Sequence, residues 1–323
     1  MTGWLIRRIS QAVVTFAIAV VLMFVLMRLA PGDPLSRMQE DRPMSAAEVA
    51  RLRAMFGLDQ PMHRQFVEFV QGVVRADLGQ SIEHGLPVTT MLASRIVPTL
   101  LLGGAAILLN FTVGLWLGVR QAVRRGTRED RVLTVLSLAS YATPSFWLGL
   151  VLAWLVGIKL GWLPVAGMQS PLLARDAPWL TRALDVGAHL VLPALTLSIV
   201  TIAGTMRYQR TALLEVLRLP YIGTARAKGV PERAVVWRHG WRNALFPMIT
   251  LFGLWLPLLV TGSVFVEWVF AWPGLGSLAA GAVGSRDYPV VMGAALLAAG
   301  LVVAASLLTD LAYALLDPRV RYS

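Results

Sequence analysis

The sequence contains no cysteine among its 323 residues, which excludes disulfide bonds, thiolate metal sites and a cysteine nucleophile. It has only two lysines, Lys159 and Lys228, and neither is followed by serine or threonine. The phosphate-binding loop GxxxxGK[ST] is therefore missing, which excludes ATP hydrolysis by that route.

Patterns typical of catalytic and metal sites are missing as well. The four histidines lie far apart in the sequence and form no HExxH pair, so we interpret each as an ordinary surface or interface residue. They are His63, His84, His189 and His239. An enzyme that acts inside a membrane would need a helix with an HExxH pair, or a Ser–His pair. His189 has no evident serine partner for such a pair. We therefore expect no catalytic residue, no metal site and no cofactor in this chain.

Charged residues are also scarce. They make up 15% of the chain, against about 25% in an average soluble domain, while 56% of the residues are hydrophobic. Six runs are long and apolar enough to cross a bilayer, which takes about 20 residues of helix. These runs are Ile9–Leu29, Thr99–Val119, Val132–Ile158, His189–Met206, Leu245–Val266 and Pro289–Leu308. They predict an all-α, polytopic membrane protein with six transmembrane helices.

The first run follows Arg7 and Arg8, as the apolar core of a signal peptide would. It is longer than a typical signal core, however, and no small-x-small cleavage site follows it, so we expect a retained transmembrane helix. Three regions follow from this assignment: a cytoplasmic N-terminus and first span (1–30), an external helical subdomain (31–98) and a five-helix core (99–323). The core would carry a cytoplasmic loop at 207–244.

The basic residues are distributed unevenly between the two sides of the membrane. The net charge is +11, which is compatible with nucleic-acid binding. If the N-terminus is cytoplasmic, however, seventeen Lys and Arg lie on the cytoplasmic side and eleven on the other. Seven of those eleven lie in the long 31–98 segment, which counts little in orientation. We therefore expect both termini in the cytoplasm, membrane lipid against the basic faces, and no nucleic-acid partner.

The spans have few ionisable groups. No Asp or Glu lies near the middle of a predicted span; Glu267 lies just outside the fifth and Asp310 at the cytoplasmic end of the sixth. Carriers driven by an ion gradient usually place such a group inside the membrane. With neither an ion-coupling residue nor an ATP site, we expect the energy for any uphill transport to come from another chain.

Prolines and isolated polar residues indicate a passage through the bundle. Thr143-Pro144-Ser145 interrupts the third span, and Pro193 and Pro257 lie in the fourth and fifth, where proline kinks a helix. These kinks are also compatible with a helix bundle that contains no passage. Candidate pathway residues are Asn110, Tyr141, Ser145 and Ser198. Each of the four could instead be a packing residue, and we expect Asn110 to form an interhelical hydrogen bond.

Two small residues in the second span predict close packing. Gly114-x-x-x-Gly118 permits close approach of another helix.

The external segment has its own helix signals. Ser45 and Glu48 form a capping box for a helix that ends at Gly57, and a second helix follows Pro61. Acidic residues in this segment are candidates for docking a partner protein, or are ordinary solvated groups. They are Asp59, Glu68 and Asp77.

The stretch YIGTARAKGV, at 221–230, differs from its apolar surroundings. A helix over Tyr221–Lys228 would be roughly 12 Å long, preceded by Pro220 and ended by Gly229 in the left-handed conformation. Its small residues leave the backbone approachable, and Arg226 and Lys228 offer charge to a partner. Such a helix suits a groove in another protein; the alternative is a basic loop on lipid head groups.

This stretch, followed by RHGWRNALFPMIT, resembles the signature loop of binding-protein-dependent ABC importer permeases. The signature triplet is Gly223-Thr224-Ala225, with Gly229 and Pro247 after it, and Gly223 replaces the usual glutamate. The gap from Gly229 to Pro247 is similar to that of the dipeptide/oligopeptide/nickel branch. Further stretches resemble the B-type permease of that branch along nearly the whole chain: LMRLAPGDPL, FGLDQPMHRQF, ADLGQSI, ATPSFWLGL, HLVLPALTLS, VFAWPGLGSL, SRDYPVV and LLDPRVRY.

The resemblance implies an inner-membrane permease that forms a pathway with a C-type permease. Two ABC ATPase subunits, which hold ATP and magnesium, would bind on the cytoplasmic side, and an extracytoplasmic substrate-binding protein would deliver the cargo. The implied ATPase-contacting residues are Gly223, Thr224, Ala225, Arg226, Ala227, Lys228 and Gly229. We expect di- or oligopeptide cargo. Nickel or a metal chelate, glutathione and a short oligosaccharide are alternatives, and an ion-gradient-driven carrier is less favoured.

Overall fold

The computed structural model describes residues 2–29, 44–174, 176–261 and 264–316. Regular structure in these ranges is helical, apart from an isolated bridge between Gln80 and Pro87. The helices are α1 (Thr2–Leu29), α3 (Ala46–Met55), α4 (Met62–Val74), α5 (Val88–Val123), α6 (Arg128–Ala142), α7 (Ser145–Leu152), α8 (Trp179–Val216), α9 (Pro220–Ala227), α10 (Glu232–Ala234), α11 (Trp241–Ala244), α12 (Phe246–Thr261), α13 (Val264–Val269), α14 (Leu275–Ser285) and α15 (Tyr288–Leu316). Two π-helical segments, Ala153–Lys159 and Val235–Gly240, continue α7 and α10.

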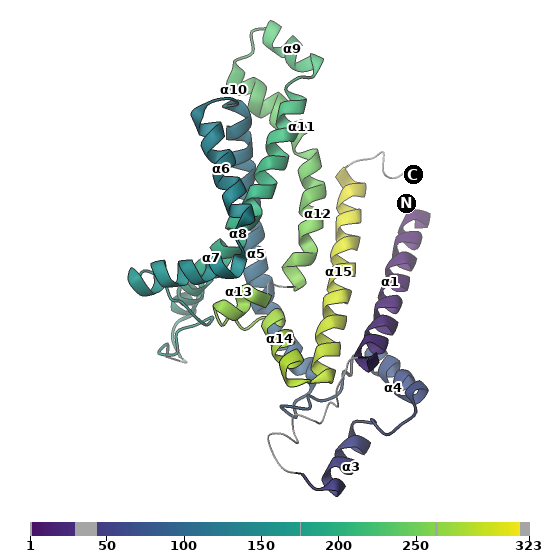
Figure 1. The fold of residues 1–323 in the computed structure, drawn as a ribbon. Coiled ribbons are helices and arrows are strands. Elements are labelled where there is room, and N and C mark those ends of the chain that lie inside the picture. The colour runs from purple at the N-terminus through teal and green to yellow at the C-terminus, as the bar shows by residue number, and fades with distance from the viewer. Residues whose placement is uncertain (1, 30–43, 175, 262–263, 317–323) are drawn as a thin grey trace.

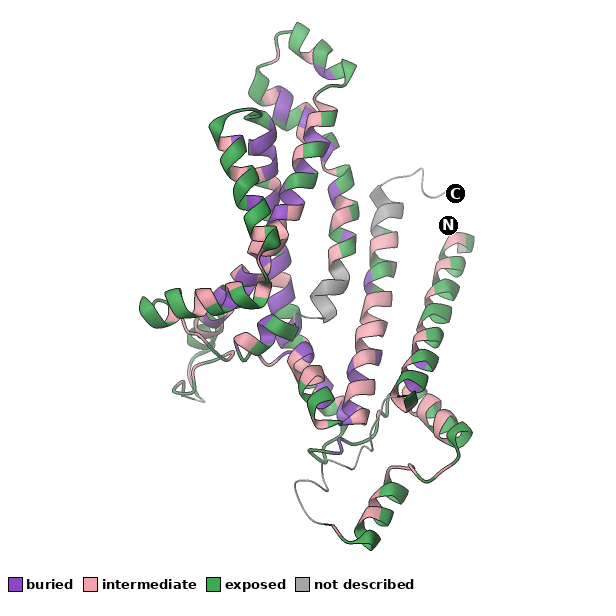
Figure 2. Ribbon diagram, in the orientation of Figure 1, coloured by how far each residue is buried: buried purple, intermediate pink, exposed green. Residues whose placement is uncertain are grey.

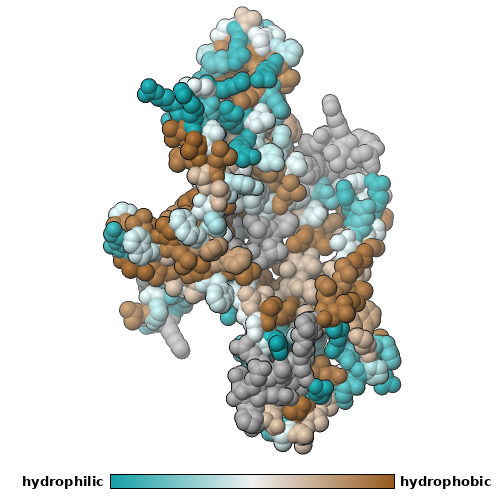
Figure 3. Space-filling model, viewed as in Figure 1, coloured by the Kyte–Doolittle hydropathy of each residue, from teal (hydrophilic) through white to brown (hydrophobic). Residues whose placement is uncertain are grey.

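Several of these helices are suited to crossing a membrane. Within the described ranges, α1, α5, α8 and α15 are each long and apolar enough, and α6 with α7 adds a fifth if the bent pair is one span. Hydrophobic side chains cover α1, α7 and the middle of the molecule, and hydrophilic ones gather toward its two ends (Figure 3). The predicted all-α, polytopic membrane fold is confirmed.

The third predicted span bends far more than a kinked helix does. Between α6 and α7 the axis turns by 103°, and α7 leaves the bundle sideways (Figure 1). Thr143 and Pro144 are both extended, and α7 starts anew after Pro144. The predicted interruption of the third span at Thr143-Pro144-Ser145 is confirmed, and the bend is larger than a kink. The helices α8 and α12 each continue through Pro193 and Pro257, and a kink at these two prolines stays a prediction.

The core of the bundle is the contact between α5 and α8. A Cβ atom at Gly118 would lie 2.6 Å from the Met206 carbonyl oxygen, and one at Gly114 would lie 3.0 Å from the Thr205 side chain. The close helix approach predicted from Gly114 and Gly118 is confirmed, and its partner is a helix of the same chain. Buried residues are accordingly concentrated along these two helices (Figure 2).

The fifth crossing consists of two separate helices. Figure 1 shows α12 beside the C-terminal half of α15 and α14 beside its N-terminal half. Gly253 of α12 packs against Thr309, whereas Leu275 of α14 packs with Val290 and Ala294. Most of the predicted span Leu245–Val266 is α12, and α13 with the turn at Phe270 and Ala271 lies between α12 and α14.

The helices between α1 and α5 lie at the end of the molecule opposite α9 (Figure 1). Ser45 and Glu48 form the predicted capping box, and Gly57 follows α3 with a φ of +62°. Phe66 of α4 packs against Phe24 of α1, with ring centroids 5.2 Å apart. The predicted ends of the first helix and the predicted start of the second are thus confirmed. Most of LMRLAPGDPL and of LLDPRVRY lies outside the described residues.

A buried carboxylate joins this external segment to the start of α15. Asp287 is 2% exposed and accepts hydrogen bonds from the Ser81 hydroxyl and from the backbone amides of Ile82 (3.1 Å) and Glu83 (3.4 Å). The ADLGQSI and SRDYPVV stretches, more than 200 residues apart in the sequence, therefore meet at this carboxylate.

Candidate functional site

The helix α9 lies at one extreme end of the molecule (Figure 1). It begins with Pro220 at its first position, where the missing N–H would have no helical partner anyway, and it is capped at Lys228. Gly229 follows with a φ of +79°, a left-handed conformation that suits glycine. The predicted helix Tyr221–Lys228 differs by one residue at each end, and its stop at Gly229 is confirmed.

One face of α9 has almost no side-chain bulk. Gly223 is exposed, and a Cβ atom added there would meet no atom of the described chain within 4 Å. The other exposed members of the predicted contact set are Thr224, Arg226, Ala227, Lys228 and Gly229; Ala225 is half-buried. The backbone around Gly223 is thus open to a partner from outside.

The opposite side of α9 is attached firmly to the chain that follows it. Ile222 is completely buried. The Tyr221 hydroxyl donates to the His239 carbonyl oxygen (3.1 Å) and accepts from the Asn243 amide (2.6 Å). Neither Ile222 nor Asn243 is assigned a role by the sequence pattern alone. The available signal was two large residues, Tyr221 and Ile222, in an otherwise small stretch.

Arg226 has a partner within the chain. Its guanidinium donates to both carboxylate oxygens of Glu232, at 3.0 and 2.6 Å, and closes the turn between α9 and α10. Arg226 and Lys228 are both exposed, and the charge that each offers to another protein stays a prediction. The hydrogen bond from Arg226 lowers the pKa of Glu232. This contact is present above the ordinary pKa of a glutamate and is lost only when the pH falls through the lowered value.

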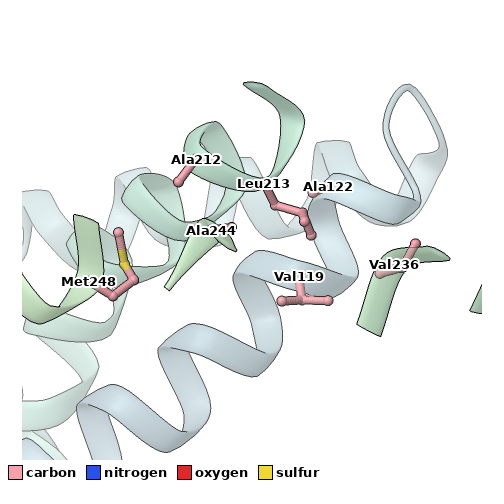
Figure 4. Packing of buried hydrophobic residues seen from close by; sticks show 7 residues of the cluster. All are labelled: Val119, Ala122, Ala212, Leu213, Val236, Ala244 and Met248. Atoms are coloured by element: carbon pink, nitrogen blue, oxygen red, sulfur yellow. The ribbon is translucent and has the colours of Figure 1, made fainter. Parts of the chain in front are cut away.

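The segment behind α9 is built into the core of the bundle. Val236 packs with Val119 and Ala122 of α5 and with Leu213 of α8 (Figure 4). Ala244 and Met248 extend the same cluster to α12. A Cβ atom at Gly240 would lie 3.1 Å from Leu217, at the end of α8. The segment behind α9 is therefore connected to α5, α8 and α12 through tightly packed residues.

Comparison with known proteins decides the family. Residues 110–322 match the family described as the binding-protein-dependent transport system inner membrane component, and residues 1–100 match its N-terminal counterpart. The chain belongs to this family. The permease is thus a multi-pass inner-membrane protein of the ABC importers, as the signature loop indicated.

Its relatives match over nearly their whole length. The permease is 38% identical to the oligopeptide transport system permease protein AppB of Bacillus subtilis (strain 168), over all of both chains. It is 36% identical to the dipeptide transport system permease protein DppB of Escherichia coli (strain K12), covering 100% of the permease and 99% of that protein. A putative peptide permease protein of Brucella ovis is 42% identical over 93% of each chain.

The four pathway candidates of the permease lie in two different places. Asn110 and Ser198 are buried between α5 and α8, where Ser198 donates to the Ala106 carbonyl oxygen (3.4 Å). Neither amide atom of Asn110 has a hydrogen-bond partner among the described residues, so the interhelical bond expected of it was wrong. Tyr141 is exposed beneath the Arg207 guanidinium, and Ser145 begins α7.

The docking candidates lie at the end of the permease opposite α9. Asp59 is exposed in the turn between α3 and α4. Glu68 and Asp77 are exposed too, and both line a cavity of about 320 Å³ with Arg28 and Tyr288. Two of the three candidates thus come together at one cavity.

Among the residues that the structure describes, no group of three or more His, Asp or Glu side chains could hold a metal ion.

Proposed function

We propose that the permease is the transmembrane subunit of an ATP-driven importer of di- and oligopeptides. It forms the pathway with a C-type permease and is coupled to two ABC ATPase subunits through α9. The observation that carries this proposal is the construction of α9, which has a bare outer face and an inner face held by Ile222 and Tyr221. The peptide cargo is supported by the names of its relatives.

The geometry gives a route for the mechanical step. ATP binding would draw the two ATPases together and displace α9, which lies in a groove of its ATPase. Because Tyr221 is bonded to the segment at 239–243 and Val236 is packed against α5 and α8, α9 cannot move without those helices. The bundle would then change between inward-open and outward-open arrangements, a rigid-body transition between two states.

The proposed orientation places α9 in the cytoplasm and α3 and α4 outside. The start of α1 and the end of α15 point toward the α9 end of the molecule (Figure 1), as expected if both termini are cytoplasmic. The substrate-binding protein would then dock at the opposite end, where Glu68 and Asp77 line the cavity beside α4. No covalent chemistry is assigned to the permease, and ATP and magnesium would be bound by the ATPases.

The cargo is tested by ATP hydrolysis of the complete complex in lipid. With the binding protein present, a mixture of di- and oligopeptides is expected to stimulate hydrolysis, and omission of the binding protein is expected to remove the stimulation. Stimulation by a nickel chelate, glutathione or a short oligosaccharide but not by peptide would contradict the proposed peptide cargo. It would not contradict the proposal that the permease belongs to an ATP-driven importer. Uptake driven by an ion gradient without the ATPases would contradict both.

A further inference from the structure

The break in the fifth crossing contains a fully buried carboxylate. Glu267 lies in α13, between the half-helices α12 and α14, and none of its surface is exposed. In the sequence, Glu267 lies just outside the fifth predicted span and has no predicted role. A buried carboxylate is costly unless it is paired or hydrogen-bonded, so its contacts show what it holds.

Both carboxylate oxygens of Glu267 accept hydrogen bonds. Oε2 accepts from the Ser277 amide (2.7 Å), and Oε1 accepts from the Thr99 hydroxyl (3.2 Å). The Thr99 oxygen in turn accepts from the Leu275 amide (2.7 Å). The first-turn amides of a helix lack helical partners, and the N-cap residue of α14, Gly274, has no side chain to satisfy them. Glu267 and Thr99 supply this cap from α13 and α5.

The adjacent sequence PGLGS is shaped around this carboxylate. A Cβ atom at Gly276 would lie 2.9 Å from Oε2 of Glu267, and one at Gly274 would overlap the carboxylate. Trp272, itself fully buried, donates its indole N–H to the Pro98 carbonyl oxygen of α5 (2.9 Å). Two independent side-chain contacts thus tie the start of α14 to one turn of α5.

The two halves of the fifth crossing belong to different packing groups. Leu275 and Ala282 of α14 pack with Val88 and Leu92, near the start of α5. At the other end, Met248 of α12 belongs to the cluster beneath α9. The halves are joined by α13 and a turn, without a continuous ladder of helical hydrogen bonds between them.

We propose that Glu267 is a positioning residue for transport. Its carboxylate makes α14 move as one body with the adjacent turns of α5, so that the fifth crossing bends at the break between α12 and α14. Separation of α14 from α5 would break the bond between the Leu275 amide and Thr99. It would also break one of the two bonds of Glu267, the one to Ser277 if α13 stays with α5 or the one to Thr99 if α13 stays with α14. A movement of α12 relative to these elements leaves these bonds intact. This inference rests on the proposed alternation between two states.

The variant Glu267→Gln weakens this cap while keeping the size of the side chain. A glutamine has one acceptor oxygen and one donor NH₂ group, so either the Thr99 hydroxyl or the Ser277 amide would face a second donor. Thr99→Val is a second variant with the same expected direction, since it removes the bridging hydroxyl at constant volume. Glu215→Gln, the same chemical change at an exposed position of α8, is the matched control.

Spin-label distances in the assembled complex test the proposal, and the cysteine-free sequence allows labels at introduced cysteines. One pair joins Val97 of α5 to Val283 of α14, and the other joins Leu254 of α12 to Val283; all three side chains are exposed. Between the nucleotide-free state and the state trapped with ATP and vanadate, the Leu254–Val283 distance is expected to shift. The Val97–Val283 distance is expected to stay single and unchanged.

In Glu267→Gln and Thr99→Val, the Val97–Val283 distribution is expected to broaden or split. The number of cargo molecules imported per ATP should fall by about tenfold or more, as expected for the loss of a buried charged hydrogen bond. The control should match the wild type in both measurements.

Two results would overturn the proposal. One is a wild-type Val97–Val283 distance that shifts as much as the Leu254–Val283 distance, or a Leu254–Val283 distance that does not shift. The other is an unchanged Val97–Val283 distribution in both variants. These outcomes differ from a failure of the proposed function, because a complex that peptide does not stimulate can still show the expected distances, and a peptide-stimulated complex can lack them.

Discussion

Asp287→Ala is expected to destabilise the permease by roughly 2–5 kcal/mol, because each buried donor left without its acceptor costs about 1–3 kcal/mol. The change removes the acceptor of the Ser81 hydroxyl and of the Ile82 and Glu83 amides. The segment between α4 and α5 would then separate from the start of α15. The measurement is the apparent melting temperature of the purified complex, together with protease cleavage in residues 79–87.

The control for this change is Asp59→Ala, which removes an exposed aspartate from the same external segment. It should leave the apparent melting temperature and the protease cleavage unchanged. An Asp287→Ala complex that melts and resists protease like the wild type would show that this carboxylate does not hold the external segment.

Ile222→Asp is expected to abolish cargo-stimulated ATP hydrolysis and uptake. Ile222 is the buried residue that fixes α9 to the segment behind it, and a charge at a fully buried position is tolerated only when paired. The inner side of α9 would leave its site, and a displacement of α9 would no longer reach α5 and α8. The measurement is the ATPase rate of the reconstituted complex, with and without binding protein and peptide.

Ile222→Leu keeps the buried volume and should cost less than about 1.5 kcal/mol, so it should retain most of the stimulation. If Ile222→Asp were stimulated like the wild type, the attachment of α9 through Ile222 would be irrelevant to coupling.

Features encoded by neighbouring residues could be predicted from the sequence. The ends of α9 follow from Pro220 and Gly229, and the capping box at Ser45 follows from Glu48 three residues later. The close contact of α5 with another helix follows from Gly114 and Gly118. In each case the signal is a backbone requirement that one residue type meets, and it acts within a few positions along the chain.

Features that depend on distant partners could not be predicted in this way. Glu267 is bonded to Thr99 and Asp287 to Ser81, at separations of 168 and 206 residues, so both carboxylates resemble ordinary loop residues in the sequence. Pro144 indicates a missing N–H but not a bend of 103°, because the angle depends on what α7 packs against. Under the proposed function, pathway residues lie between two permeases, where the pattern of one chain does not identify them.

Gly223 lies on the bare face of α9 that is proposed to receive an ATPase, and substitutions at Gly223 test this contact. A Cβ atom at Gly223 meets no described atom within 4 Å, so the permease itself can accommodate a side chain there. Gly229 is less suitable, because its φ of +79° would be strained by any other residue. Gly223→Ala should even favour the helix, by about 0.5–1 kcal/mol.

The decisive measurement compares Gly223→Trp with Gly223→Ala in the complete complex in lipid, by cargo-stimulated ATP hydrolysis. Alanine is expected to preserve stimulation and tryptophan to abolish it, because the indole would project into the groove that receives α9. If the tryptophan variant were stimulated like the wild type, α9 would not be the surface through which ATP hydrolysis drives this permease.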